Sequence, residues 1–160
     1  MAVTSFLAGE DISQGDAVYV DTNGFVYKAC GQYLNQASVV GVAIDAGTLG
    51  RLIRIATDNI YNGFSGQLPG EYKYLSILTS GQLVSYSGWQ SEFLSTGYDS
   101  YLTVVGRAVT TSGLEVESST PTVISNPSQF ILLQSSTGLD LDAILLEDGS
   151  TSIELESATP

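Results

Sequence analysis

Pairs of carboxylates separated by one residue are the pattern in this chain most able to do chemistry. They occur at Asp140-Leu141-Asp142, Glu154-Leu155-Glu156 and Glu115-Val116-Glu117. Alternate side chains of a β-strand share a face, so each pair would place two carboxylates side by side. Such a pair could bind Ca²⁺ or serve a glycosidase. We favour the other interpretation, a solvated strand face whose apolar residues point inward.

The other residue types that catalysis usually needs are scarce. The chain has no histidine and one cysteine, Cys30, so it can form neither a Ser-His-Asp or Cys-His arrangement nor a histidine-bound zinc site. Neither GxxxxGKS/T nor GxGxxG occurs. We expect Cys30 to be a small, half-buried apolar residue. The sequence therefore predicts a protein that is not an enzyme and has no catalytic residues, no cofactor and no metal site.

The net charge limits the classes of partner that this protein could bind. Seventeen acidic and five basic residues give a net charge of -12, and charged residues make up only 14% of the chain, against a usual ~25%. Nucleic acids and anionic membranes are disfavoured, because neutralising their phosphates needs clustered Lys and Arg. Hydrophobic residues make up 43%, which indicates a folded domain with a core and not a disordered chain.

No segment has the pattern of an export signal or a membrane span. Residues 1–7 lack both a basic start and a long apolar run, and no stretch approaches the ~20 apolar residues that a spanning helix requires. We expect synthesis in a cytoplasm without export by the usual route.

The first two-thirds of the chain contain the same pattern twice. A strand, a tight turn and a second strand are predicted over residues 12–27 and again over 68–84. Each unit is followed by a related strand, Val39-Val40-Gly41-Val42-Ala43 and Val104-Val105-Gly106-Arg107-Ala108. Internal repeats define an architecture. This one predicts an all-β fold, a small β-barrel or sandwich built from two similar hairpin-rich halves, with a C-terminal β-hairpin extension.

Three segments follow from this pattern. Residues 1–11 are predicted to be an extended N-terminal arm that pairs with its own sheet or with a neighbouring subunit. Residues 12–117 form the β-rich core. Residues 118–160 comprise a linker, over 118–128, and a tail of two short hairpins that begin at Ile131 and Ile144. Two such hairpins bury little alone, so we expect the tail to pack on the body or, preferably, with other copies about a symmetry axis.

The largest concentration of aromatic residues lies in a predicted long loop, over residues 85–100. The aromatic residues in and beside it are Tyr86, Trp89, Phe93, Tyr98 and Tyr101. Helical periodicity is nearly absent from the chain, and at most one turn is expected within this loop, over residues 90–94. Three roles are open for the loop: a platform for sugars, an anchor for a protein partner, or packing against the core.

In their order, the duplicated units resemble the capsid decoration (cement) proteins of tailed bacteriophages. The segments that carry the resemblance are ISQGDAVYVDTNGFVYKA, VVGVAIDAGTLGRLIRIA, LPGEYKYLSILTSGQLV and VVGRAVTTSGLEVE. The resemblance covers about residues 8–117. Each motif is common by itself, and their order is the more specific feature. The tail, over residues 118–160, is not needed by the family core.

The resemblance implies a structural protein on the outer surface of the virion. It would bind the major capsid protein, cement neighbouring capsid subunits and associate with itself, commonly as a homotrimer. The contact residues that we predict are Val3, Phe6 and Leu7 in the arm, and Trp89, Phe93 and Tyr98 in the aromatic loop. The alternative function is a carbohydrate-binding adhesin or fibre component that uses residues 85–101. A glycosidase is a third and weaker possibility.

Overall fold

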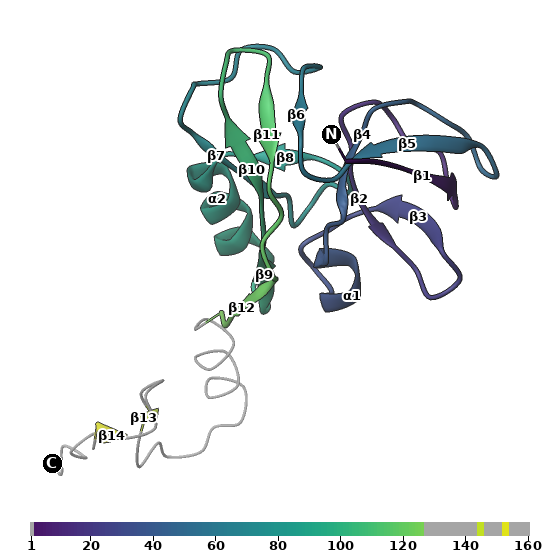
Figure 1. The fold of residues 1–160 in the computed structure, drawn as a ribbon. Coiled ribbons are helices and arrows are strands. Elements are labelled where there is room, and N and C mark those ends of the chain that lie inside the picture. Colours follow the sequence, from purple (N-terminus) through teal and green to yellow (C-terminus); the bar gives the residue numbers. More distant parts are fainter. Residues whose placement is uncertain (1, 127–143, 146–151, 154–160) are drawn as a thin grey trace, which may run out of the picture. The chain divides into compact units, whose positions relative to one another are not determined.

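The computed structural model describes residues 2–126, 144–145 and 152–153. The chain divides into two compact units, residues 1–126 and 127–160. In the described part of the first unit, strands predominate over two helices (Figure 1). The predicted all-β character is confirmed.

Five strands form the first sheet, which closes into a barrel with the order β1-β3-β2-β4-β5. Strand β1 closes it, because it pairs antiparallel with β5 on one edge and parallel with β3 on the other. The strands are β1 (Val3–Ala8), β2 (Ala17–Val20), β3 (Phe25–Lys28), β4 (Gly41–Ala43) and β5 (Leu52–Ala56). We call these five strands the first repeat.

The second sheet is open and has the order β6-β11-β10-β7-β8. Its strands are β6 (Ile60–Tyr61), β7 (Tyr72–Leu75), β8 (Leu83–Val84), β10 (Val104–Ala108) and β11 (Leu114–Val116). We call these strands, with the helix between β8 and β10, the second repeat. In chain order, β1 to β5 correspond to β6, β7, β8, β10 and β11. With this correspondence, the strands that pair in the second sheet are the counterparts of strands that pair in the first. Only the closing contact differs, since no pairing joins β6 to β8 among the described residues.

Equivalent turns precede β2 and β7. Gly15 donates its N–H to the carbonyl of Ala43 at 2.8 Å, and Gly70 donates to the carbonyl of Ala108 at 2.7 Å. Both glycines have left-handed backbone angles, φ 90° and 91°, which side chains with a Cβ rarely adopt. The carbonyls of the next residues, Asp16 and Glu71, accept from the same two alanines. The two repeats therefore share detailed backbone geometry as well as strand order.

A glycine in β4 and another in β10 allow close approach of a neighbouring strand. A Cβ at Gly41 would overlap the carbonyl oxygen of Ala56 in β5, and a Cβ at Gly106 would overlap that of Glu115 in β11. Glycine within a strand often marks such an approach. These are the glycines of the repeated sequence VVGVA and VVGRA.

Two hydrophobic clusters hold the fold together. One fills the barrel and contains Ala8, Ile12, Val18, Val26, Ala43, Ile53 and Ile55. The other combines residues of both repeats, among them Ala17, Val42, Leu75, Val105, Leu114 and Val116. Strand β2 serves both clusters, because Val18 points into the barrel and Ala17 points toward the second repeat.

A helix follows the hairpin in each repeat, and the two differ in length. Helix α1 spans Leu34–Ala37 and α2 spans Tyr86–Thr96. Ser85 caps α2 by accepting from the N–H of Gly88, and Gly97 ends it in a left-handed conformation. No helix in the described ranges is both long and apolar enough to cross a membrane.

Helix α2 corrects the predicted aromatic loop over residues 85–100. Tyr86, Trp89, Phe93 and Leu94 have the spacing i, i+3, i+7 and i+8 of one helical face. Serines and a glycine between them lower the helix propensity of the segment, and our periodicity analysis underestimated this pattern. Packing of α2 on the sheet, together with its two caps, stabilises the helix by more than the low helix propensity of the segment destabilises it.

Residues 1–11 are not a free arm. Residues 3–8 form β1, which is paired on both edges within the barrel, so the first of the two predicted alternatives, pairing with its own sheet, holds. Strand β5 covers one edge of β1 from Val3 to Leu7, and β3 pairs with the other edge at Leu7 and Ala8. Residues 3–8 therefore belong to the barrel and are not a free arm, and the contact role of Val3, Phe6 and Leu7 stays a prediction.

The predicted linker is also partly a strand. Residues Thr122–Ile124 form β12, which pairs antiparallel with β9 (Ser100–Leu102). In the tail, β13 (Ile144–Leu145) pairs antiparallel with β14 (Ser152–Ile153). The rest of the predicted tail hairpins lies outside the described residues.

Candidate functional site

Trp89 is a packing residue of α2. Its side chain is only 3% exposed and stacks on Phe93 with ring centroids 5.2 Å apart and an angle of 9°. Its indole Nε1 is buried and has no hydrogen-bond partner. Of the three roles open for the aromatic segment, packing against the core is the one that the structure gives Trp89; its assignment as a contact residue stays a prediction.

The remaining predicted contact residues lie in two separate places. Phe93 and Tyr98 are half-buried, in and just after α2. On β1, Val3 is half-buried and Phe6 packs against the barrel core. Leu7 is exposed and faces the exposed Leu52 of β5. The structure therefore brings Trp89 and Phe93 together and places the β1 residues elsewhere.

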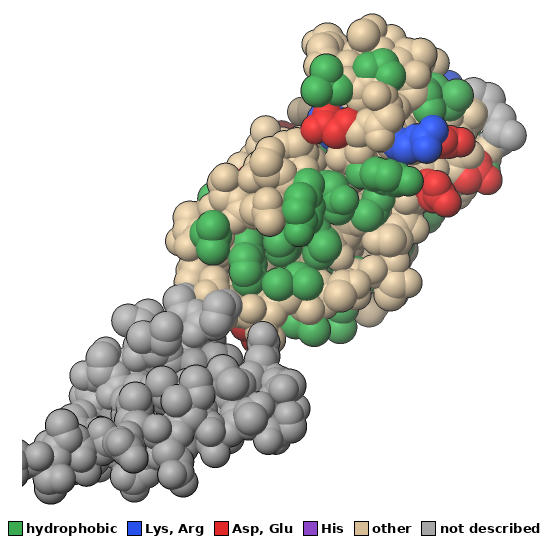
Figure 2. Space-filling view, turned by 90° about the vertical axis from the view of Figure 1, so that its left-hand side faces the viewer, with side chains coloured by type: hydrophobic (Ala, Val, Ile, Leu, Met, Phe, Trp, Pro, Cys, Tyr) green, Lys and Arg blue, Asp and Glu red, His purple; other side chains and the backbone are tan. Residues whose placement is uncertain are grey.

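A hollow of about 520 Å³ lies along α2 and beside β12. Leu94, at its rim, is 79% exposed, and Tyr86 is exposed as well. No charged side chain lines this hollow; the residues that do are Tyr86, Ser87, Trp89, Gln90, Ser91, Phe93, Leu94 and Ile124. Figure 2, viewed from the side of α2 in Figure 1, shows hydrophobic side chains gathered in the middle of this part of the surface.

The apolar surface continues from α2 onto β7. The ring of Tyr74 lies 5.5 Å from that of Tyr86. The exposed Tyr72 lines a further hollow with Val104 and Glu117. We call the surface made by these residues the α2 face; its members are Tyr72, Tyr74, Tyr86, Phe93, Leu94, Val104 and Ile124. Exposed apolar patches of this kind often mark interaction sites.

A half-buried carboxylate, that of Glu92, fixes α2 to the sheet. Glu92 accepts hydrogen bonds from the hydroxyl of Ser76, at 2.9 and 3.0 Å, and from the N–H of Ile77 at 2.7 Å. Ser76 and Ile77 directly follow β7 and are both buried. The helix therefore presents the α2 face from a fixed position.

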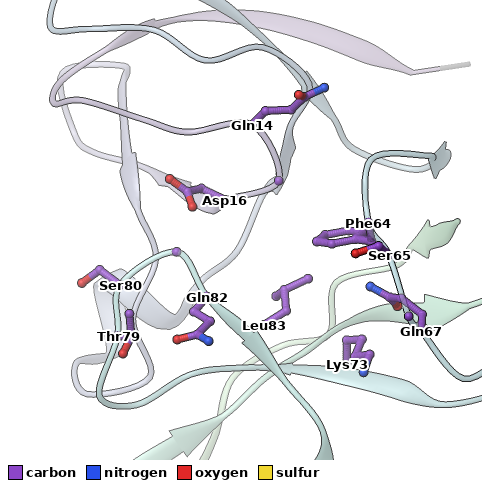
Figure 3. Close-up of a pocket in the computed structure, with 13 residues that line it drawn as sticks. Gln14, Asp16, Phe64, Ser65, Gln67, Lys73, Thr79, Ser80, Gln82 and Leu83 are labelled. Carbon is purple, nitrogen blue, oxygen red and sulfur yellow. The ribbon is translucent and has the colours of Figure 1, made fainter. Parts of the chain in front are cut away.

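A second hollow, a cleft of about 440 Å³, lies between the repeats (Figure 3). Residues 14–16 border it from the first repeat, 64–67 from the segment after β6, and 73 and 79–83 from the β7–β8 hairpin. This site could not be predicted from the sequence, because its residues come from four separate segments and none forms a motif. The sequence feature that could have pointed to this cleft is the set of glutamines at positions 14, 67 and 82.

The charges around the cleft nearly cancel. Lys73 forms an ion pair of 2.8 Å with Glu71, and both side chains are largely buried. Burial raises the pKa of Asp16, although the N–H of Ser13, at 2.8 Å, and Lys28 partly offset this effect. Gln67 is 7% exposed, and its Oε1 has no donor. The cleft thus offers amides, hydroxyls and little net charge.

One of the three carboxylate pairs can be assessed. Glu115 and Glu117 are exposed while Leu114 and Val116 are buried, which confirms the solvated strand face for this pair. The pairs at 140–142 and 154–156 lie outside the described residues. Among the residues that the structure describes, no group of three or more His, Cys, Asp or Glu side chains could hold a metal ion.

Comparison with known proteins adds no assignment: no protein-family model matches this sequence, and no curated protein matches it.

Proposed function

We propose that this protein is a structural, non-enzymatic component of a tailed-phage head. It binds the outer capsid surface and cements neighbouring major capsid subunits. The observation that carries the proposal is the α2 face, on which the hollow along α2 has no charged lining residue and Leu94 is 79% exposed. Glu92 holds α2 in place. The resemblance of residues 8–117 to decoration proteins supports it independently.

The chemistry of the α2 face suits attachment to a large, repetitive surface. Burying one exposed leucine side chain contributes about 1.5–3 kcal/mol, so a few such contacts per copy give modest affinity. Repeated across a shell, and across the subunits of a homotrimer, these contacts combine by avidity. The hollow along α2 has no charged lining residue, which limits repulsion between an acidic partner and a chain of net charge -12.

The duplicated strand order supports the same class of protein. We infer that both repeats derive from one ancestral unit, with the first closed as a barrel and the second left open to carry α2. The motifs common to both repeats serve turns and packing. The C-terminal hairpin extension and the homotrimer remain parts of this proposal.

The alternative, a carbohydrate-binding adhesin that uses residues 85–101, has lost its main support. A sugar platform needs exposed aromatic faces, and Trp89 is buried beneath Phe93. Within α2, Tyr86 is the aromatic residue that remains exposed.

A matched pair of leucines tests the proposal. Leu94 lies on the α2 face. Leu49, 70% exposed, belongs to the connection between β4 and β5, two strands that lie away from α2 in Figure 1. The protein and its variants Leu94→Lys and Leu49→Lys are mixed with undecorated shells assembled from major capsid proteins of several tailed phages. Binding is measured by co-sedimentation and by the melting temperature of the shell.

We expect the unmodified protein to bind one of these shells and raise its melting temperature. Leu94→Lys should weaken binding by about 10-fold or more, because it removes an apolar contact and buries a charge. Leu49→Lys should bind as the unmodified protein does. Absence of binding to every shell, or equal binding of both variants, would contradict the proposal.

A further inference from the structure

The cleft between the repeats exists because the second repeat is not closed. In the first repeat, β1 runs six residues and joins β5 to β3. Its counterpart β6 has two residues and pairs only with β11 within the described part of the chain. Residues 64–67 follow β6, and residues 79–83 lead into β8, so the cleft occupies the seam that a longer β6 would have closed.

One residue at this seam, Lys73, is polar, whereas its counterpart in the first repeat belongs to the hydrophobic core. Residues 17–20 of β2 correspond to 72–75 of β7, so Lys73 occupies the position of Val18. Val18 is fully buried in the barrel core, whereas Lys73 lines the cleft. A position that only needed to pack would favour an apolar residue here too, since burying a lysine costs free energy unless it is paired. Lys73 is paired with Glu71, which offsets that cost, and the replacement makes the wall of the cleft polar.

The groups around the cleft favour hydroxyls over ions. The three glutamines can each donate and accept hydrogen bonds, and Ser65, Thr79 and Ser80 add hydroxyls. Buried polar atoms are nearly always paired, yet Gln67 Oε1 has no donor. In Figure 3, Phe64 and Gln67 extend from one side of the cleft toward Leu83, so an apolar surface lies beside the amides.

Charged ligands fit this site poorly. An anion would meet the Asp16 carboxylate and a Lys73 already neutralised by Glu71. A metal ion would find one carboxylate, and that one already accepts the N–H of Ser13. A neutral ligand with adjacent hydroxyls on one side and C–H groups on another satisfies the amides, the hydroxyls and the Phe64 ring together. The volume is within the ordinary range for small-molecule sites.

We propose that this cleft binds a neutral saccharide unit. Gln67 and Gln82 hydrogen-bond its hydroxyls, and Phe64 and Leu83 contact its C–H face. No residue of the α2 face lines the cleft, so saccharide binding neither requires nor blocks attachment to a shell. A carbohydrate site would therefore lie between the repeats and not in residues 85–101.

Replacing each of three glutamines by methionine, two in the cleft and one outside it, tests this site. Gln67→Met and Gln82→Met remove an amide from the cleft and nearly keep the side-chain volume, and Gln90→Met makes the same change on the exposed side of α2. Binding of D-glucose, D-galactose, D-mannose and N-acetyl-D-glucosamine to the full chain is measured by saturation-transfer difference NMR at millimolar concentrations. Thermal melting confirms that each variant is folded.

We expect saturable binding of at least one of these sugars. Gln82→Met should weaken it about 5-fold or more through the loss of a hydrogen bond, Gln67→Met should do the same if the variant melts as a folded protein, and Gln90→Met should leave it unchanged. No saturable binding of any sugar, or a Gln82→Met variant that binds as tightly as the unmodified chain, would overturn the proposal. Shell binding by the same samples is read separately, so either proposal can fail alone.

Discussion

The two repeats have the same strand order but differ in the closure of their sheets and in their helices. The first closes on itself, and its short helix α1 has no side-chain cap. The second stays open, and its helix α2 is capped at both ends and fixed by Glu92. Both candidate surfaces, the α2 face and the cleft, involve the second repeat. The comparison indicates that one strand order can close in one copy and stay open in the other, and that the open copy contributes to both candidate surfaces.

The largest effect is expected from the paired glycines. Gly41→Ala and Gly106→Ala each place a Cβ against a backbone carbonyl of the neighbouring strand, so both should lower the free energy of unfolding by about 2–4 kcal/mol. Gly41 should be the more sensitive, because β4 is held between β2 and β5 in a closed ring. Denaturant unfolding measures both, and an alanine tolerated at either position would refute the close approach there.

The anchor of α2 should have the next largest effect. Glu92→Ala leaves the buried Ser76 hydroxyl and the Ile77 N–H without their acceptor, which should cost about 1–3 kcal/mol. Hydrogen exchange should show faster opening of α2 than of the barrel strands. Glu117→Ala removes the same charge from an exposed side chain and serves as the control. Equal stability of the two variants would mean that α2 does not depend on this carboxylate.

The smallest effect concerns Asp16 and Glu71, which hold equivalent positions in the repeats. Glu71 is paired with Lys73, whereas burial raises the pKa of Asp16 above its ordinary value of 3.8. A raised carboxyl pKa means that the folded state binds the proton more tightly, so ionisation of Asp16 destabilises the fold as the pH rises through its unfolded and then its folded pKa.

Asp16→Asn should therefore melt slightly higher than the unmodified protein at pH 7, since asparagine can still accept the N–H of Ser13. The difference should vanish toward pH 3, where Asp16 is protonated in both states. Melting temperatures of the two proteins across this range measure it. A variant that is less stable at pH 7 would show that the ionised carboxylate stabilises the fold despite its burial.

Local patterns predicted the fold best where neighbouring residues alone specify the structure. The turn glycines and alternating valines of residues 12–27 and 39–43 predicted strands that the structure contains. The predictions failed where packing between distant segments decides. Residues 3–8 were extended as expected, but only the barrel shows that they pair with β5 along their length and with β3 at Leu7 and Ala8. Trp89 was prominent in the sequence, and its burial under Phe93 depends on the fold of α2 against β7 and β8.

The amino-acid sequence by itself established the all-β class, the duplication, the acidic charge and the lack of histidine, because composition and strand periodicity are properties of the chain alone. The tertiary structure decided that one repeat closes and the other does not, that α2 is a helix, and that a polar cleft forms between the repeats. These features depend on pairing and packing between residues far apart in the sequence, and no local pattern encodes which distant partner a strand edge or a side chain will meet.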